Sequence, residues 1–109
     1  MTTLRVGAGK TAPGQGWQVY QPVPGVIYID VDTSAARFKG TPTYTTSLSS
    51  TGGTQLWTIG ASSVYNPTAT SFRIHLRRAD KNETAPDPLT PAVAAQFGFY
   101  IQWIGVDEP

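Results

Sequence analysis

The feature that most limits what this chain can fold into is a two-residue alternation of apolar and polar side chains. The clearest case is the segment SFRIHLRR at residues 71–78, where three apolar residues alternate with three basic ones. They are Phe72, Ile74 and Leu76 against Arg73, His75 and Arg77. Successive side chains of a β-strand point to opposite faces, so this pattern predicts an antiparallel strand that is buried on one face.

The same alternation predicts further strands along the chain. It is strong at residues 26–33, 43–48, 56–61 and 99–106, and weaker at 4–7 and 17–20. In the segment 56–61, Trp57 and Ile59 are predicted to share a face. Gly- and Pro-rich segments typical of turns separate these strands. One short helix is predicted after Thr90, which can cap it, with Pro91 at the first helical position. The predicted fold class is therefore all-β, a six- to seven-stranded antiparallel β-sandwich in one domain, residues 1–109.

Composition excludes several classes of protein. Charged residues make up only 14% of the chain, below the roughly one quarter that is usual in globular proteins. Fifteen Thr and seven Ser take much of their place, and this composition argues against a helical bundle. A net charge of +1 argues against nucleic-acid binding. No apolar run is long enough for a membrane span, and residues 1–10 lack the apolar core of a secretory signal. We therefore expect no membrane insertion, and a protein that is extracellular or virion-associated after release or otherwise cytoplasmic.

The residues available for catalysis are few. The chain has no Cys and a single His, which excludes disulfides, thiolate nucleophiles and His clusters for a metal. His75 lies between Arg73 and Arg77, whose charges disfavour its protonated form. Asp30 and Asp32 share a strand face, as paired glycosidase carboxylates would, but solvation or turn contacts with Ser34 explain them better. We expect no enzyme activity, no cofactor and no metal.

A phosphate-binding loop is also excluded. Gly9, Lys10 and Thr11 match only the end of such a motif, and Pro13 follows where a helix would have to begin. Binding is the class of function that remains. Hydroxyl, amide and guanidinium groups can hydrogen-bond a hydroxyl-rich ligand, and aromatic rings can stack on the apolar face of a sugar.

The last predicted strand is apolar on both faces. Three residues form one face and three the other, with Gln102 as the only polar side chain before Asp107. The two sets are Phe99, Ile101 and Trp103, and Tyr100, Ile104 and Val106. One face can meet the core and the second a neighbouring copy, which predicts a closed homo-oligomer. The alternative is that the chain's own N-terminal segment or loops cover the second face.

Three segments of the sequence together resemble the H-type lectin domain, the family of snail agglutinin and of the C-terminal domain of discoidins. They are LRVGAGK…GQGW at 4–17, NPTATSFRIHL at 66–76 and FYIQWIGVDE at 99–108. The stretches 31–50 and 89–96 resemble a bacterial and phage-associated branch of that domain. The resemblance implies a six-stranded antiparallel sandwich assembled as a homotrimer, which could pair into a hexamer, with sugar sites between protomers.

The resemblance also points to four residues for carbohydrate binding: Gly25, Trp57, Arg78 and Asp80. In the snail lectins a galactosamine-type sugar is held by an acidic residue, an Arg and a Trp-His pair. Here the first loop keeps Gly25 without the acid, Trp57 stands where the Arg would be, and Ala79 and Asp80 replace the Trp-His pair. Trp57 would then stack on the glycan, Arg78 and Asp80 would bind its hydroxyls, and Gly25 would allow close backbone approach.

Two functions follow as hypotheses. The first is a non-catalytic lectin-like domain that recognises cell-surface glycans through sites between protomers. The second is a structural or host-attachment subunit of a phage tail, virion or similar particle, whose partners would be the structural proteins of that particle.

Overall fold

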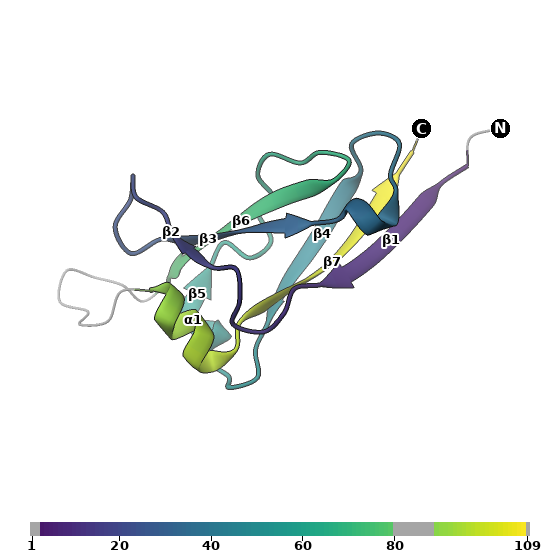
Figure 1. The fold of residues 1–109 in the computed structure, drawn as a ribbon. Helices are drawn as coiled ribbons and strands as arrows, with labels where there is room; N and C mark the ends of the chain where they lie inside the picture. The colour runs from purple at the N-terminus through teal and green to yellow at the C-terminus, as the bar shows by residue number, and fades with distance from the viewer. Residues whose placement is uncertain (1–2, 80–88, 109) are drawn as a thin grey trace.

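The computed structural model describes residues 3–79 and 89–108. These residues form two antiparallel sheets, one with the strand order β1-β7-β4 and one with the order β2-β3-β6-β5 (Figure 1). The strands are β1 (Arg5–Lys10), β2 (Gln18–Val19), β3 (Ile27–Asp32), β4 (Thr43–Ser49), β5 (Thr58–Ile59), β6 (Ser71–Arg78) and β7 (Tyr100–Asp107). The predicted all-β antiparallel architecture is confirmed.

The two sheets enclose one hydrophobic core, as the alternation predicts. The inward-facing residues of β3 and β6 are almost completely buried; they are Ile27, Ile29, Val31, Phe72, Ile74 and Leu76. Tyr44 of β4 and Trp103 of β7 are buried from the other sheet, and the Tyr44 and Phe72 ring centroids lie 4.5 Å apart. Each large apolar side chain buried in this way contributes roughly 1.5–3 kcal/mol to folding.

Two glycines make room for an aromatic ring on the inner face of the three-stranded sheet. Gly7 of β1 pairs directly with Gly105 of β7, and the buried Phe38 ring lies over them. A Cβ atom on Gly105 would lie 2.8 Å from Phe38 Cζ, which is closer than carbon atoms can approach. The segment before β4 can therefore pack its ring against the sheet backbone.

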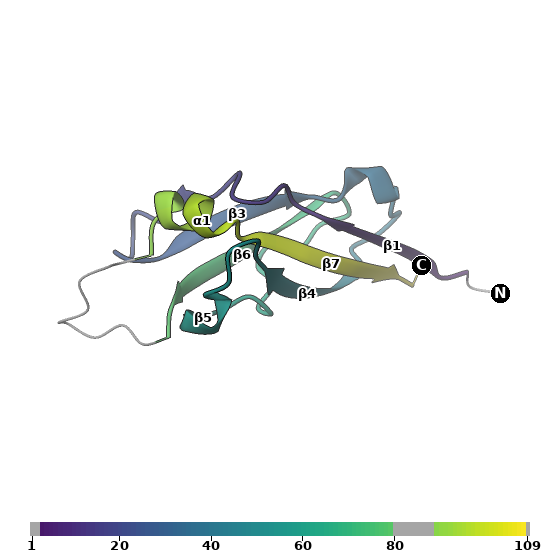
Figure 2. The ribbon, with the colours of Figure 1, turned by 90° about the horizontal axis from the view of Figure 1, so that it is seen from below.

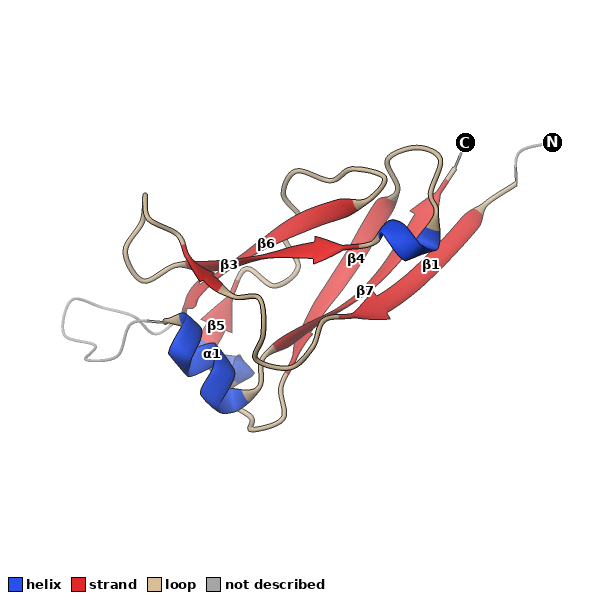
Figure 3. Cartoon of the chain, in the orientation of Figure 1, coloured by secondary structure: helices blue, strands red, loops and turns tan. Residues whose placement is uncertain are grey.

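The predicted helix forms at the expected place. It is α1 (Pro91–Phe97), and the Thr90 side chain accepts a hydrogen bond of 3.2 Å from the Val93 backbone N–H. Gly98 ends the helix in the left-handed conformation, with φ of 66°. Figure 2 and Figure 3 show α1 at one end of the sheets, with both chain termini at the opposite end. Among residues 3–79 and 89–108, no helix has the length and apolar character needed to cross a membrane.

The outer face of the β1-β7-β4 sheet carries solvent-exposed apolar side chains on β1 and β7, beside the Thr and Ser side chains of β4. Ile104 is 51% exposed, and strand register places it beside Ala8 of β1 and Thr45 of β4. Val106 lies in the same way beside Val6, which is 64% exposed. Within the described part of the chain, this second face of β7 therefore exposes Ile104 and leaves Tyr100 and Val106 half-buried. The alternative prediction, that the chain's own segments cover this face, does not hold for Ile104.

The segment 56–61 differs from the prediction. A 3-10 turn at Gln55–Trp57 takes the place of the first half of the expected strand, and β5 retains only two residues. The Trp57 backbone N–H donates to the Thr54 carbonyl at 3.0 Å, which rotates the chain out of the strand conformation. The prediction that Trp57 and Ile59 share one face is wrong, because the two side chains line different pockets.

Candidate functional site

A pocket of about 450 Å³ lies where β5 and β6 meet α1. Its apolar wall contains Trp57, Leu89, Val93 and Phe97, and Thr54 and Arg78 are among its polar groups. We call it the Trp57 pocket. Its volume and its mixture of apolar walls with a few polar groups are typical of small-molecule sites.

The indole of Trp57 is held from two sides and remains partly open. The Phe97 ring packs edge-on against it, with the ring centroids 6.1 Å apart and the planes at 85°. The Arg78 guanidinium carbon lies 5.1 Å from the indole centroid, within cation–π distance. Trp57 is nonetheless 39% exposed. A braced, partly exposed aromatic ring of this kind is a suitable surface for the apolar face of a ligand.

Thr54 is a site residue that sequence reasoning missed. Its φ is 75°, a conformation that is unusual for a β-branched residue. Its hydroxyl oxygen is buried without a hydrogen-bond partner among the described residues, and the side chain lines the Trp57 pocket. Strained backbone residues cluster at functional sites, and an unsatisfied buried hydroxyl is rare enough in native structures to need an explanation. Nothing in the sequence distinguishes Thr54 from the other threonines, because both properties arise from the fold.

The four predicted binding residues do not all line one pocket. Trp57 and Arg78 come together in one pocket. Gly25 lies in the turn between β2 and β3, with φ of 83°, and does not line that pocket. Asp80 lies outside the described residues. Within one protomer the structure therefore unites two of the four.

The only histidine lies on the outer face of the other sheet. The centroids of the Tyr20 and Tyr65 rings are 4.7 Å and 4.6 Å from that of the His75 imidazole, and both rings are steeply inclined to it. Burial lowers the pKa of His75 below its ordinary value of 6.5, the nearby Arg73 charge lowers it further, and Asp30 partly opposes both effects. This direction agrees with the predicted penalty on the imidazolium, although burial contributes more than the arginines.

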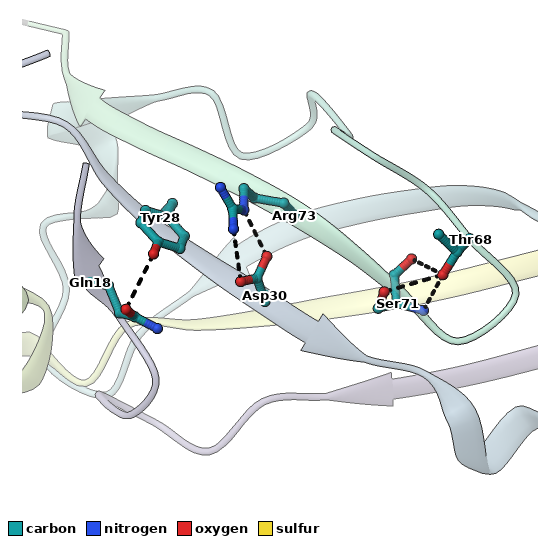
Figure 4. Close-up of polar contacts among 6 residues, drawn as sticks. All are labelled: Gln18, Tyr28, Asp30, Thr68, Ser71 and Arg73. Atoms are coloured by element: carbon teal, nitrogen blue, oxygen red, sulfur yellow. Dashed lines mark hydrogen bonds and ion pairs between the residues drawn. The ribbon is translucent and has the colours of Figure 1, made fainter. Parts of the chain in front are cut away.

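The two carboxylates of β3 are engaged in structural contacts. Asp30 forms a two-point ion pair with Arg73, with contacts of 2.7 Å and 3.0 Å (Figure 4). Asp32 accepts a hydrogen bond of 2.9 Å from the Ser34 backbone N–H, and contacts with Ser34 lower its pKa. The contact with Ser34 confirms the turn-contact interpretation of Asp32. In the described parts of the chain, no group of three or more His, Asp or Glu is placed to hold a metal ion.

We compared the chain with protein-family models, with curated proteins and with solved structures, and none of the three comparisons found a match. The likeness to H-type lectins therefore stays a prediction from the residues that carry it.

Proposed function

We propose that this protein is a non-catalytic carbohydrate-binding domain of the H-type lectin kind, which binds glycans at the Trp57 pocket. The observation that carries the proposal is the arrangement of Trp57. Its indole is braced by Phe97 and Arg78, partly exposed, and next to a buried hydroxyl that has no protein partner in the described chain.

The pocket offers the two kinds of contact that a sugar needs. The apolar face of a pyranose ring can stack on the Trp57 indole, while the hydroxyl groups at the ring edge reach the Arg78 guanidinium. The Thr54 hydroxyl can donate to or accept from a sugar hydroxyl, and this would satisfy a group that otherwise costs about 1–3 kcal/mol when buried alone.

Assembly would complete the site and raise its affinity. The exposed apolar side chains of β1 and β7 support self-association, because burying Val6 and Ile104 against another copy removes apolar surface from water. In a homotrimer, Gly25 of the partner subunit would approach the Trp57 pocket, which the Gly25 of the same chain does not line. Three weak sites presented together would bind a glycan-bearing surface with avidity.

A glycan array tests the proposal. The wild-type protein and Trp57→Ala would be compared with Val19→Ala, a control that removes an exposed apolar side chain (50%) from outside the pocket. We expect wild type and Val19→Ala to bind the same glycans and Trp57→Ala to lose them while remaining folded. A wild-type protein that binds no glycan at high concentration would contradict the proposal.

A second candidate function is a structural or host-attachment subunit of a phage tail, virion or similar particle. The exposed apolar sheet face favours it, because such a surface suits permanent assembly whether or not a sugar is bound. Sedimentation measurements of wild type and Ile104→Asp report the oligomeric state. Together with the glycan array, they separate the two functions. Stable oligomers without glycan binding would favour the structural function, and a monomeric wild type would contradict it.

A further inference from the structure

A second cavity lies on the other side of β5 from the Trp57 pocket. It has a volume of about 460 Å³ and lies over the outer face of β6. Its lining includes Tyr20, Ile59, Ser63, Tyr65, His75 and Arg77. We call it the His75 cleft. Its volume falls within the range of small-molecule sites, roughly 300–1,000 Å³.

The imidazole in this cleft has unused hydrogen-bonding capacity. Both ring nitrogens of His75 are buried, and neither has a hydrogen-bond partner among the described residues. A neutral imidazole carries one donor and one acceptor, and native structures rarely leave both without a partner. The rings packed closest to it belong to Tyr20 and to Tyr65, which is 46% exposed. His75 is itself one of the residues that line the cleft.

The charges around the cleft favour an anion. Arg77 lines it, and no Asp or Glu does so within the described residues. Arg73 lies on the same strand face, and its charge is paired with that of Asp30. Among the described residues, the cleft therefore has the Arg77 guanidinium with no carboxylate in its lining, beside an imidazole that becomes a second cation when it is protonated.

From this arrangement we propose that the His75 cleft is a second ligand site, which takes a sugar bearing a carboxylate, such as a uronic acid. The carboxylate would pair with the Arg77 guanidinium and accept a hydrogen bond from His75. The tyrosine rings and the Ser63 hydroxyl would contact the sugar ring and its hydroxyl groups. This site is separate from the Trp57 pocket, so it does not depend on the function proposed for that pocket.

The proposal couples binding to proton uptake. The groups that face His75 are Tyr20, Tyr28 and Tyr65, with Arg73 and Asp30 beside them and Arg77 on the same strand face. In the free protein, burial and Arg73 hold the His75 pKa low. A bound carboxylate favours the imidazolium and raises that pKa. Affinity should therefore increase as the pH falls through the range in which His75 becomes protonated.

Because His75 is the only histidine, its imidazole signals in an NMR spectrum can be assigned without ambiguity. The probes are methyl glucuronide and its neutral counterpart, methyl glucoside. We expect the glucuronide to shift the His75 signals, to raise the His75 pKa and to bind more tightly at pH 5.5 than at pH 7.5. The glucoside should leave the His75 signals and pKa unchanged.

Variants separate this site from the Trp57 pocket. Arg77→Gln should weaken glucuronide binding by about tenfold or more, since it removes a charge-assisted pair. His75→Gln should abolish the pH dependence, and Trp57→Ala should leave the His75 response intact even if it abolishes glycan binding on an array. The proposal is overturned if the glucuronide leaves the His75 pKa unchanged. It is also overturned if the His75 signals move with protein concentration alone, which would make the cleft a contact between copies.

Discussion

Asp107 offers a direct test of how the fold is held together at the end of β7. Its side chain is only 3% exposed, and its Oδ2 accepts hydrogen bonds from the backbone N–H groups of Lys39 at 2.8 Å and Gly40 at 3.1 Å. Hydrogen bonds to a charged group contribute about 1.5–3 kcal/mol each, and water can partly replace the carboxylate because Lys39 and Gly40 are exposed. We therefore expect Asp107→Ala to lower the free energy of unfolding by about 2–4 kcal/mol.

Two further variants separate the carboxylate's hydrogen bonds from its charge. Asp107→Asn keeps an acceptor oxygen without the charge, so it should cost about half as much as Asp107→Ala, roughly 1–2 kcal/mol. Glu108→Ala, at the exposed neighbouring position, is the matched control and should stay within about 0.5 kcal/mol of wild type. Urea unfolding at pH 7, with the midpoint compared at constant m-value, measures all three. An Asp107→Ala variant as stable as Glu108→Ala would refute the reasoning.

Three other outcomes are expected. Tyr44→Phe should cost about 1–3 kcal/mol in urea unfolding, because the Tyr44 hydroxyl donates to the Thr68 carbonyl at 2.7 Å; an unchanged midpoint would contradict this. Gly105→Ala should cost about 1–3 kcal/mol, because the added methyl overlaps the Phe38 ring, and equal stability would mean that the ring moves freely. The pKa of His75 is lower in the folded protein than in the unfolded chain, so as the pH falls the unfolded chain takes up this proton at a higher pH. His75 therefore leaves the free energy of unfolding at its full value above pH 6.5 and lowers it as the pH drops below that value. Between pH 5 and 8, the melting temperature should change less with pH for His75→Gln than for wild type. An identical pH dependence of the two proteins would contradict this prediction.

Sequence patterns predicted the parts of the fold in which one face is buried. β3 and β6 match the alternation residue by residue, because a strand that slipped by one position would expose its whole apolar set. The helix was predictable because its capping residues are local, with Thr90 before it and Gly98 after it. The segment 56–61 was not predictable, because a single backbone rotation at Thr54 converts an alternating pattern into a turn.

The candidate site was predictable only in part. The resemblance to H-type lectins pointed to Trp57 and Arg78 for one site, and the structure brings them together, with the Arg78 guanidinium carbon 5.1 Å from the indole centroid. The buried hydroxyl of Thr54 and the unpartnered nitrogens of His75 could not be anticipated, because burial depends on packing between segments far apart in the chain. The absence of Gly25 from the lining of the Trp57 pocket could not be anticipated either, since a linear sequence does not show which loops meet in space.

The most direct test of glycan binding uses the three tryptophans, each of which gives one indole N–H signal in a nitrogen-labelled NMR spectrum. Trp17 and Trp103 are buried in the core, whereas Trp57 is 39% exposed and lines the Trp57 pocket. Titration with a glycan selected on the array should move the Trp57 signal and leave the other two in place. A glycan that binds without moving the Trp57 signal would contradict the account.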